Sequence, residues 1–545
     1  MRKSFVEKQS PVLPILPPSL ETFEVHPRER IGPEWRTFGS MRLGIDFGTT
    51  HTVVAAVDRG NYPIVSFEHA DFVPSLAAAG EDGTLRFGAQ AAAVAHDPAW
   101  TVLRSFKRLL NDAGPESEVA VGPRTMKVVD LLTGFLSHVR DELYLRSNAH
   151  PRAGEPLKAA VSVPANASSA QRILTVDAFR RAGFDVVALL NEPSAAGFEY
   201  AHRFRETVTS KREYVLVYDL GGGTFDASLI KMEGRANEVV TSSGVARLGG
   251  DDFDEAILRL VEAKLGTVAS IRERRLLLDE CRVQKESVNP NTRKLAVDLA
   301  ALGRHEPLVV PTDEVYAACA PLVQQTLEAM EPAMRDPRRE NEGVDWSELA
   351  GIYVVGGASA FPPVYRLLRE RFGAHRVRRS PHPFGSTAIG LAITLDERAG
   401  YSLAERLTRH FGVFREESAG AEVSFDVLLP KDTCLPAPGG PPLSVTRRYR
   451  AAHNLGHFRF VECARIEQGR PEGNLAMWDE VLFPFDPRLR AVRDLATVPV
   501  RRLDGDGPQV EETVRCDAAG ELEVQLRVLD DGFSNTVRIA RRGNA

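Results

Sequence analysis

Two stretches of the chain share one order of apolar and polar positions. Residues 215–218 are apolar and are followed by Asp219, Leu220, three glycines, a threonine and Asp226, before residues 227–230 become largely apolar again. Residues 43–57 repeat this order, with Asp46, a glycine and two threonines between two apolar runs. A glycine-rich turn between two short apolar runs predicts a β-hairpin. The repeat therefore predicts two hairpins of matching design.

Strand and helix patterns alternate around these hairpins. Short continuous apolar runs predict buried strands at 159–164, 186–190 and 352–355. Apolar residues at helical spacing predict a helix over 130–145. Further helices are expected from about 250, and over 171–182, 274–286, 315–334, 359–372 and 386–395. Alternation of strands and helices predicts an α/β fold.

The pattern changes after residue 395. Strict alternation of apolar and polar residues, broken by proline and glycine, predicts an all-β sandwich. Its expected strands lie at 423–429, 443–449, 457–463, 511–516 and 522–528. The predicted domains are a disordered arm (1–40), an α/β nucleotide-binding domain (41–395), a linker (396–409) and a β-sandwich (410–545). The arm is assigned because residues 1–40 are rich in proline and charge and lack periodicity.

Composition and charge argue against several classes of function. The formal net charge of −6 over 545 residues argues against a nucleic-acid partner bound by phosphate neutralisation. Five scattered cysteines without a CxxC pair fit a reducing compartment and no zinc site. No apolar run approaches the roughly 20 residues that span a bilayer, and no signal peptide is recognised. We expect a cytoplasmic protein with no membrane partner.

The two hairpins carry the candidate chemistry. Backbone N–H groups of a glycine turn can bind phosphate. Carboxylates such as Asp46, Asp219 and Asp226 suit hydrated Mg²⁺, which prefers oxygen ligands and keeps several waters. An ordinary glycine-tipped hairpin with turn-forming aspartates is the alternative. No GxxxxGK[ST] motif occurs, and no GxGxxG motif lies convincingly between a strand and a helix. A P-loop is thus excluded and a Rossmann site disfavoured.

Several motifs together carry a family resemblance. Residues 43–50, 191–196, 219–226, 248–254 and 355–358 occur in an order that closely resembles the DnaK-type seventy-kilodalton heat-shock (Hsp70) chaperones. The resemblance covers 41–395. Residues 428–436 and 514–522 are more weakly similar to that family's peptide-binding sandwich. The family's helical lid is not recognised, so we expect a divergent, lidless member.

The resemblance implies an actin-like, ribonuclease-H-like domain with two lobes around a cleft that binds ATP or ADP with Mg²⁺. Asp46 and Asp219 are then expected near the metal, and Glu192 and Asp226 near its waters and the attacking water. Thr224 joins Asp46, Glu192 and Asp226 in the predicted catalytic set. The predicted nucleotide-binding residues are Gly48, Thr49, Thr50, Gly222, Gly223, Thr224, Gly249, Gly250, Lys285, Gly356 and Gly357. Pro164 and Arg172 match positions that relay the nucleotide state between domains.

Three of these residues also suit a purely structural role. Glu192 suits the start of a helix. Lys285 suits a solvated helix face. Arg172 suits a surface salt bridge.

Three departures from the family pattern stand out. The family's phosphate-binding lysine is matched to Ala92, its adenine-stacking arginine to Ala360, and its acid near the ribose to Arg282. A missing lysine removes positive charge from the transition state, and loss of one such donor typically costs roughly 100- to 1,000-fold in rate. We therefore expect the protein to bind ATP rather than to hydrolyse it fast.

Three functional hypotheses follow. The first is an ATP-driven chaperone, a slow ATPase that binds unfolded peptide segments, assisted by a J-domain co-chaperone and a nucleotide exchange factor. The second is a non-catalytic or very slow ATP-binding sensor or scaffold. The third is a small-molecule kinase of the same superfamily.

Overall fold

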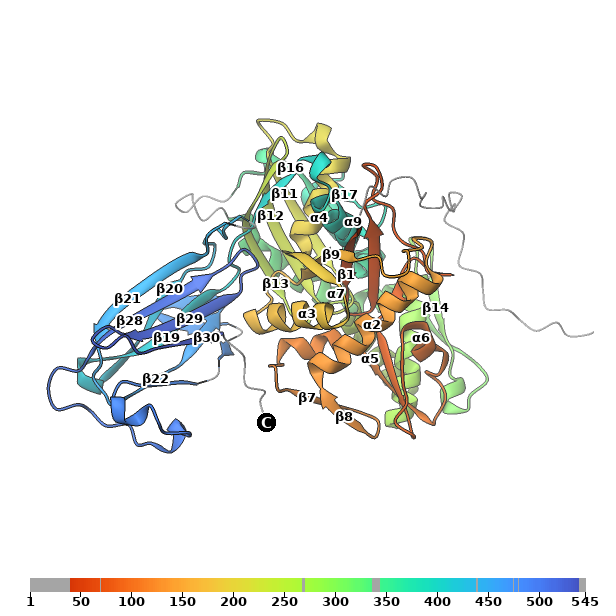
Figure 1. Ribbon diagram of the computed structural model, residues 1–545. Helices are drawn as coiled ribbons and strands as arrows, with labels where there is room; N and C mark the ends of the chain where they lie inside the picture. The colour runs from red at the N-terminus through yellow and green to blue at the C-terminus, as the bar shows by residue number, and fades with distance from the viewer. Residues whose placement is uncertain are drawn as a thin grey trace, which may run out of the picture.

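The computed structural model describes residues 40–538, except 69, 267–269, 336–343, 438–439, 474 and 479. The predicted arm, residues 1–40, lies outside this part apart from its last residue. An α/β portion is followed by a β-rich portion, which Figure 1 shows in blue as a separate body beside it. Both parts of the predicted fold class are therefore confirmed.

The α/β portion is built on two sheets of similar plan. The first has the order β10-β9-β1-β2-β3 and the second β17-β16-β11-β12-β13-β18. In each, an antiparallel hairpin lies next to a parallel strand: β1–β2 beside β9, and β11–β12 beside β16. The two sequence repeats thus occupy equivalent places. The strands are β1 (Met41–Phe47), β2 (His51–Ala56), β3 (Val73–Pro74), β9 (Leu157–Val163), β10 (Asp185–Asn191), β11 (Tyr214–Leu220), β12 (Phe225–Glu233), β13 (Ala236–Val245), β16 (Leu349–Val355), β17 (Val377–Arg379) and β18 (Ser402–Ala404).

Two helices join the sheets. Helix α4 (Glu192–Arg203) packs on β11 and β12, and α9 (Ser386–Thr394) packs on β1, β2 and β9. The two helices also pack on each other and thereby join two lobes. The first lobe is built on the sheet that contains β1, and the second on the sheet that contains β11. Small residues permit this contact: a Cβ on Gly390 would lie 1.7 Å from the carbonyl oxygen of Ala195.

The other predicted helices are also present. They are α2 (Val128–Arg146), α3 (Ser169–Arg181), α5 (Gly250–Leu265), α6 (Ile271–Ser287), α7 (Thr312–Met330) and α8 (Pro362–Phe372). Between α6 and α7, β14 (Lys294–Val297) and β15 (Leu308–Pro311) form an antiparallel pair. Within the described residues, no helix is long and apolar enough to cross a membrane.

The β-rich portion consists mainly of two four-stranded sheets around a shared apolar core, with the orders β20-β19-β23-β26 and β21-β28-β29-β30. Strands β20 (Glu422–Leu429), β21 (Leu443–Arg450), β28 (Gln509–Cys516) and β29 (Leu522–Val528) follow the predicted alternation. The expected strand at 457–463 is two strands, β22 (Leu455–Phe458) and β23 (Phe460–Cys463), which belong to different sheets. Alternation did not reveal β19 (His410–Glu417), β26 (Ala476–Met477) or β30 (Ser534–Arg538).

The segment expected to be a linker is part of the second sheet. After the short turn Glu397–Ala399, β18 pairs in parallel with β13. The backbone and side-chain amides of Asn191 both donate to Glu405. Hydrogen bonding to the α/β portion therefore fixes the path of the chain into the β-rich portion.

Replacing Gly390 by alanine should destabilise the α/β portion. The new methyl group would overlap backbone at the α4–α9 contact, and overpacking of this kind typically costs about 1–3 kcal/mol. Thermal unfolding of Gly390→Ala is therefore expected at a clearly lower temperature than for the wild type. An unchanged midpoint would contradict the close helix contact.

Candidate functional site

The turns of the two hairpins face each other across a cleft. A Cβ on Gly222 would lie 2.6 Å from the Thr50 side chain, and one on Gly223 would lie 2.7 Å from the Thr49 side chain. Only glycine allows these turns to approach so closely. The geometry brings the backbone of one turn and the hydroxyl groups of the other to the same place.

Two further glycine segments complete the cleft. The N–H of Gly250 donates to the carbonyl of Gly221 at 3.0 Å, and a Cβ on Gly249 would lie 2.7 Å from the Gly222 backbone. Gly356 ends β16 with φ of 83°, and a Cβ there would lie 2.4 Å from Oδ1 of Asp219. Each glycine keeps a side chain out of the space between the turns.

The resulting cleft is open to solvent and contains about 840 Å³ of empty space. The predicted site residues that line it are Asp46, Gly48, Thr49, Thr50, Glu192, Asp219, Gly222, Thr224, Gly250, Lys285, Gly356 and Gly357. Asp226 and Thr224 line an adjoining cavity with Pro164. Gly223 and Gly249 are placed beside the cleft by their contacts with Thr49 and Gly222.

Four carboxylates gather where the cleft meets the adjoining cavity: Glu192, Asp219 and Asp226 are buried, and Asp46 is half-buried. Burial and the nearby Glu192 raise the pKa of Asp46 to about 7 and that of Asp226 to about 8. The same causes, with Asp226 and Asp46 as further neighbours, raise the pKa of Asp219 well above its usual value. With all four carboxylates ionised, the cluster would carry more negative charge than the surrounding protein can stabilise.

A lysine beside the carboxylates was not expected, because the family's phosphate-binding lysine is matched to Ala92. Ala92 lies exposed on α1 (Gly88–Ala93) and does not line the cleft. Lys107, on the 3-10 helix Phe106–Asn111, is buried with Nζ 2.6 Å from Oε1 of Glu192. Burial alone would lower the pKa of Lys107, but Glu192 and Asp46 raise it, so this lysine is charged.

Lys107 stands in an apolar segment, between Phe106 and Leu109–Leu110. A lysine in such a place is a signal for a buried, paired charge. That signal is present in the sequence, whereas the family resemblance pairs the lysine position with Ala92.

The donor set fits a hydrated divalent cation bound together with phosphates. Among the described residues, no three His, Cys, Asp or Glu side chains converge closely enough to bind a metal directly. Mg²⁺ usually keeps several waters and takes only one or two carboxylates, which suits carboxylates spread around a cleft. The cluster of Asp46, Asp219, Asp226 and Glu192 around one lysine leaves negative charge for such a cation to neutralise.

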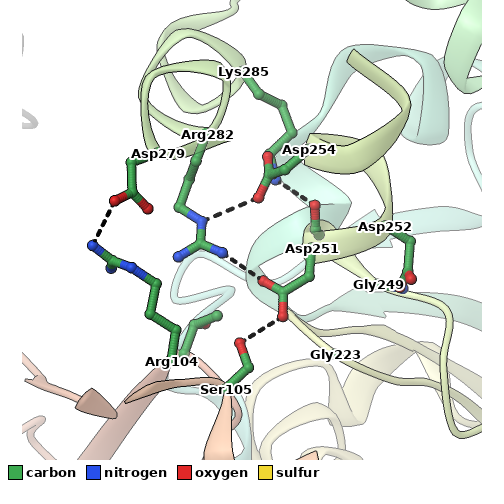
Figure 2. Close-up of polar contacts among 12 residues, drawn as sticks. Arg104, Ser105, Gly223, Gly249, Asp251, Asp252, Asp254, Asp279, Arg282 and Lys285 are labelled. Carbon is green, nitrogen blue, oxygen red and sulfur yellow. Dashed lines mark hydrogen bonds and ion pairs between the residues drawn. The ribbon is translucent and has the colours of Figure 1, made fainter. Parts of the chain in front are cut away.

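The other end of the cleft is held by a network of ion pairs between α5 and α6 (Figure 2). Arg282 binds Asp251 at 2.8 Å and Asp254 at 3.0 Å. Lys285 binds Asp254 at 2.6 Å and the carbonyl of Gly250 at 2.8 Å. Lys285 is thus buried and braces the start of α5, in contrast to the solvated charge that was the alternative. Ala360, which ends the turn Gly357–Ala360, is exposed.

The network also crosses the cleft. Arg104 binds Asp279 at 2.8 Å, and the Ser105 hydroxyl donates to Asp251 at 2.6 Å (Figure 2). Arg108 binds Asp252 at 2.8 Å and the carbonyl of Gly223 at 3.0 Å. These residues, which sequence reasoning did not single out, hold the first lobe against the second.

Arg172 and Pro164 lie where the β-rich portion meets the first lobe. Arg172 is buried and donates to the carbonyl of Ala519 at 3.2 Å and to Asn191 at 2.5 Å. Pro164 precedes Ala165 and Asn166, whose N–H groups donate to Asp226. Arg172 is thus a buried residue at a contact between the two portions, in contrast to the surface salt bridge that was the alternative.

The pKa shifts predict how the nucleotide-free protein responds to pH. A carboxyl whose pKa is raised on folding stabilises the fold below its unfolded pKa and loses that contribution as pH rises. We expect the unfolding temperature in EDTA to fall between about pH 4 and about pH 8, and Asp226→Asn to reduce the fall. Glu467→Gln, an exposed acid in the β-rich portion, is the control. Parallel profiles for wild type and Asp226→Asn would contradict the burial of this charge.

Comparison with known proteins identifies the family. The family model described as Hsp70 protein matches residues 141–402. A chaperone protein HscA homolog of Burkholderia multivorans is 35% identical over 379 residues, which cover 66% of this chain and 59% of that protein. The HscA homolog of Bordetella petrii is 34% identical over 392 residues, which cover 69% of this chain and 61% of that protein.

The HscA homolog of Burkholderia lata is 36% identical over 380 residues, which cover 66% of this chain and 59% of that protein. The chain thus spans 59–61% of the length of these curated relatives. The α/β portion, with two hairpins opposed across a cleft, has the actin-like fold of an Hsp70 ATPase domain. The chain belongs to the Hsp70 family.

Proposed function

We propose that the protein is an Hsp70-type chaperone that binds and slowly hydrolyses ATP and couples the nucleotide state to the binding of extended peptide segments. The observation that carries this proposal is the pair of opposed glycine turns over four carboxylates and Lys107. A cleft with this donor set suits a triphosphate with Mg²⁺.

Each part of the cleft has a role in this proposal. The turns at Gly48–Thr50 and Gly222–Thr224 hold the phosphates through backbone N–H and hydroxyl groups. Asp46 and Asp219 hold Mg²⁺ through its waters, and the ion, when bound, neutralises charge on the phosphates. Lys107 adds a fixed positive charge beside Glu192.

Asp226 is placed to orient the attacking water. Its carboxylate is held by the N–H groups of Ala165 and Asn166 and lines a cavity next to Thr224. A buried carboxyl with a raised pKa accepts a proton more readily near neutral pH, so Asp226 also suits the role of proton acceptor. Glu192 is paired with Lys107, which keeps both side chains in place.

The structure offers a route from the cleft to the β-rich portion. The Asp226 carboxylate contacts the turn at 165–166, which leads into α3. The first N–H of α3, on Ser169, donates to both carboxylate oxygens of Glu462 from β23, at 3.2 Å. Trp478 donates to the same carboxylate at 2.7 Å. A shift of the 165–169 segment would therefore move or release the β-rich portion.

Burying the Glu462 carboxylate costs free energy. The contacts that it makes therefore influence how the two portions are arranged. It is 4% exposed, and its partners are the start of α3, Trp478 and Arg409. An anionic side chain at a helix N-terminus is stabilised by the helix dipole. Undocking would hydrate the carboxylate and expose the helix end, which gives two states that a nucleotide can bias.

The clients in this proposal are unfolded or extended peptide segments, with a J-domain co-chaperone and a nucleotide exchange factor as possible partners of the same cycle. The sensor hypothesis rested on a missing lysine, and Lys107 removes that basis. Docking of a β-rich portion against the ATPase lobe favours a chaperone over a small-molecule kinase.

Removing the lysine charge should slow hydrolysis more than binding. For Lys107→Met, we expect single-turnover ATP hydrolysis to fall roughly 100- to 1,000-fold, as for loss of one charge-stabilising donor. Isothermal titration should still detect Mg²⁺-ATP. Ala92→Lys is the matched control and should hydrolyse ATP at the wild-type rate, because position 92 lies outside the cleft. Absence of nucleotide binding by the wild type would refute the proposed function.

Neutralising Glu462 should uncouple the two portions. For Glu462→Gln, we expect ATP to accelerate release of a fluorescent extended peptide at least about tenfold less than in the wild type, because hydrogen bonds to buried charges contribute about 1.5–3 kcal/mol. Glu467→Gln, on an exposed neighbouring strand, should behave as wild type. Equal stimulation in Glu462→Gln and wild type would rule out this route.

A further inference from the structure

One aromatic ring in the cleft has no role in the chemistry described so far. Phe384 precedes α9 and is 51% exposed. It is the only phenylalanine among the exposed large apolar side chains of the described chain. An isolated exposed aromatic on a surface needs no explanation, but Phe384 lines the cleft together with Pro383 and Thr387.

The fold makes room for this ring. A Cβ on Gly357 would lie 2.2 Å from Cε1 of Phe384, so the ring rests directly on the glycine turn after β16. The neighbouring Gly356 approaches Asp219 in the same way. The glycine under Phe384 is therefore the direct neighbour of the glycine that contacts Asp219 of the carboxylate cluster.

A second ring supports Phe384. The rings of His51 and Phe384 meet edge to face, with centroids 5.6 Å apart and planes at 73°. His51 is held in turn by Phe72 at 4.2 Å and by a 3.0 Å hydrogen bond between its Nδ1 and the Thr50 hydroxyl. Burial, and then Arg282, lower the pKa of His51 to about 4, so this support is uncharged. His51 and Phe384 are the aromatic side chains among the described residues that line the cleft.

The polar side chains at this end are engaged with one another. Arg282 is shared between Asp251 and Asp254, and Lys285 between Asp254 and the Gly250 carbonyl. Figure 2 shows that both cations point into this network from α6. Ala358 lines the cleft with only a methyl group, and Ala360 does not line it. The flat surface that remains for a planar group is the ring of Phe384.

We propose that Phe384, supported by His51, is the platform on which the nucleoside part of the nucleotide packs. The inference rests on the proposed function, because it requires that the hairpins hold the phosphates. It assigns a specificity-determining contact to a residue outside the predicted site. Base stacking on an aromatic side chain typically contributes about 1–3 kcal/mol, so the ring accounts for a large share of the preference for a nucleoside over a bare phosphate chain.

The test compares two probes, Mg²⁺-ATP and Mg²⁺ with inorganic triphosphate, by isothermal titration. Phe384→Ala should weaken ATP binding roughly 5- to 150-fold and leave triphosphate binding unchanged. Phe384→Tyr should restore ATP binding, since it keeps the ring. Val309→Ala, which removes a 48% exposed apolar side chain outside the cleft, is the matched control.

A spectroscopic variant tests the contact directly. In Phe384→Trp, fluorescence of the introduced indole should change on addition of ATP but not of triphosphate. If the wild type binds ATP and Phe384→Ala binds it equally well, the inference is overturned while the proposed function stands. Wild-type protein that binds neither probe overturns both.

Discussion

The arrangement of the ATPase lobes depends on one electrostatic constraint: four carboxylates gather around a single lysine. Asp46, Asp219 and Asp226 come from the two hairpins, Glu192 from the start of α4, and Lys107 from the first lobe. Burial disfavours the charged form of a carboxyl group, so an empty cluster is poorly stabilised. A bound cation and the N–H groups of the two glycine turns would relieve this, as the proposed binding of an anion with its own metal requires.

The glycines are the steric counterpart of that constraint. Gly222, Gly223, Gly249 and Gly356 lie where any side chain would meet Thr50, Thr49, the opposite turn or Asp219. The glycines allow the turns of the two hairpins to approach each other closely. The ion pairs of Arg104 and Arg108 hold the two lobes in this position.

A second buried charge links the lobes to the β-rich portion. The Glu462 carboxylate accepts a hydrogen bond from the N-terminus of α3. The Arg172 guanidinium donates to the carbonyl of Ala519, which follows β28. Both contacts are shielded from water, so each is strong when formed and costly when half-broken. Contacts of this kind favour two defined arrangements over a continuum, which is the property that a nucleotide-driven cycle requires.

The sequence determined the repeated hairpins, the order of strands and helices in the α/β portion and the alternation of most β-strands, because these depend on local periodicity and turn residues. It also predicted Asp46, Asp219 and Glu192 as site residues, each from a motif of a few consecutive residues, and all three line the cleft. It did not reveal Lys107, which enters the site from another part of the chain, or strand β18 within 396–409, which forms by pairing with β13. The burial of Lys285, the partners of Arg172 and the place of Phe384 also required the tertiary structure, since each depends on contacts between residues far apart in the chain.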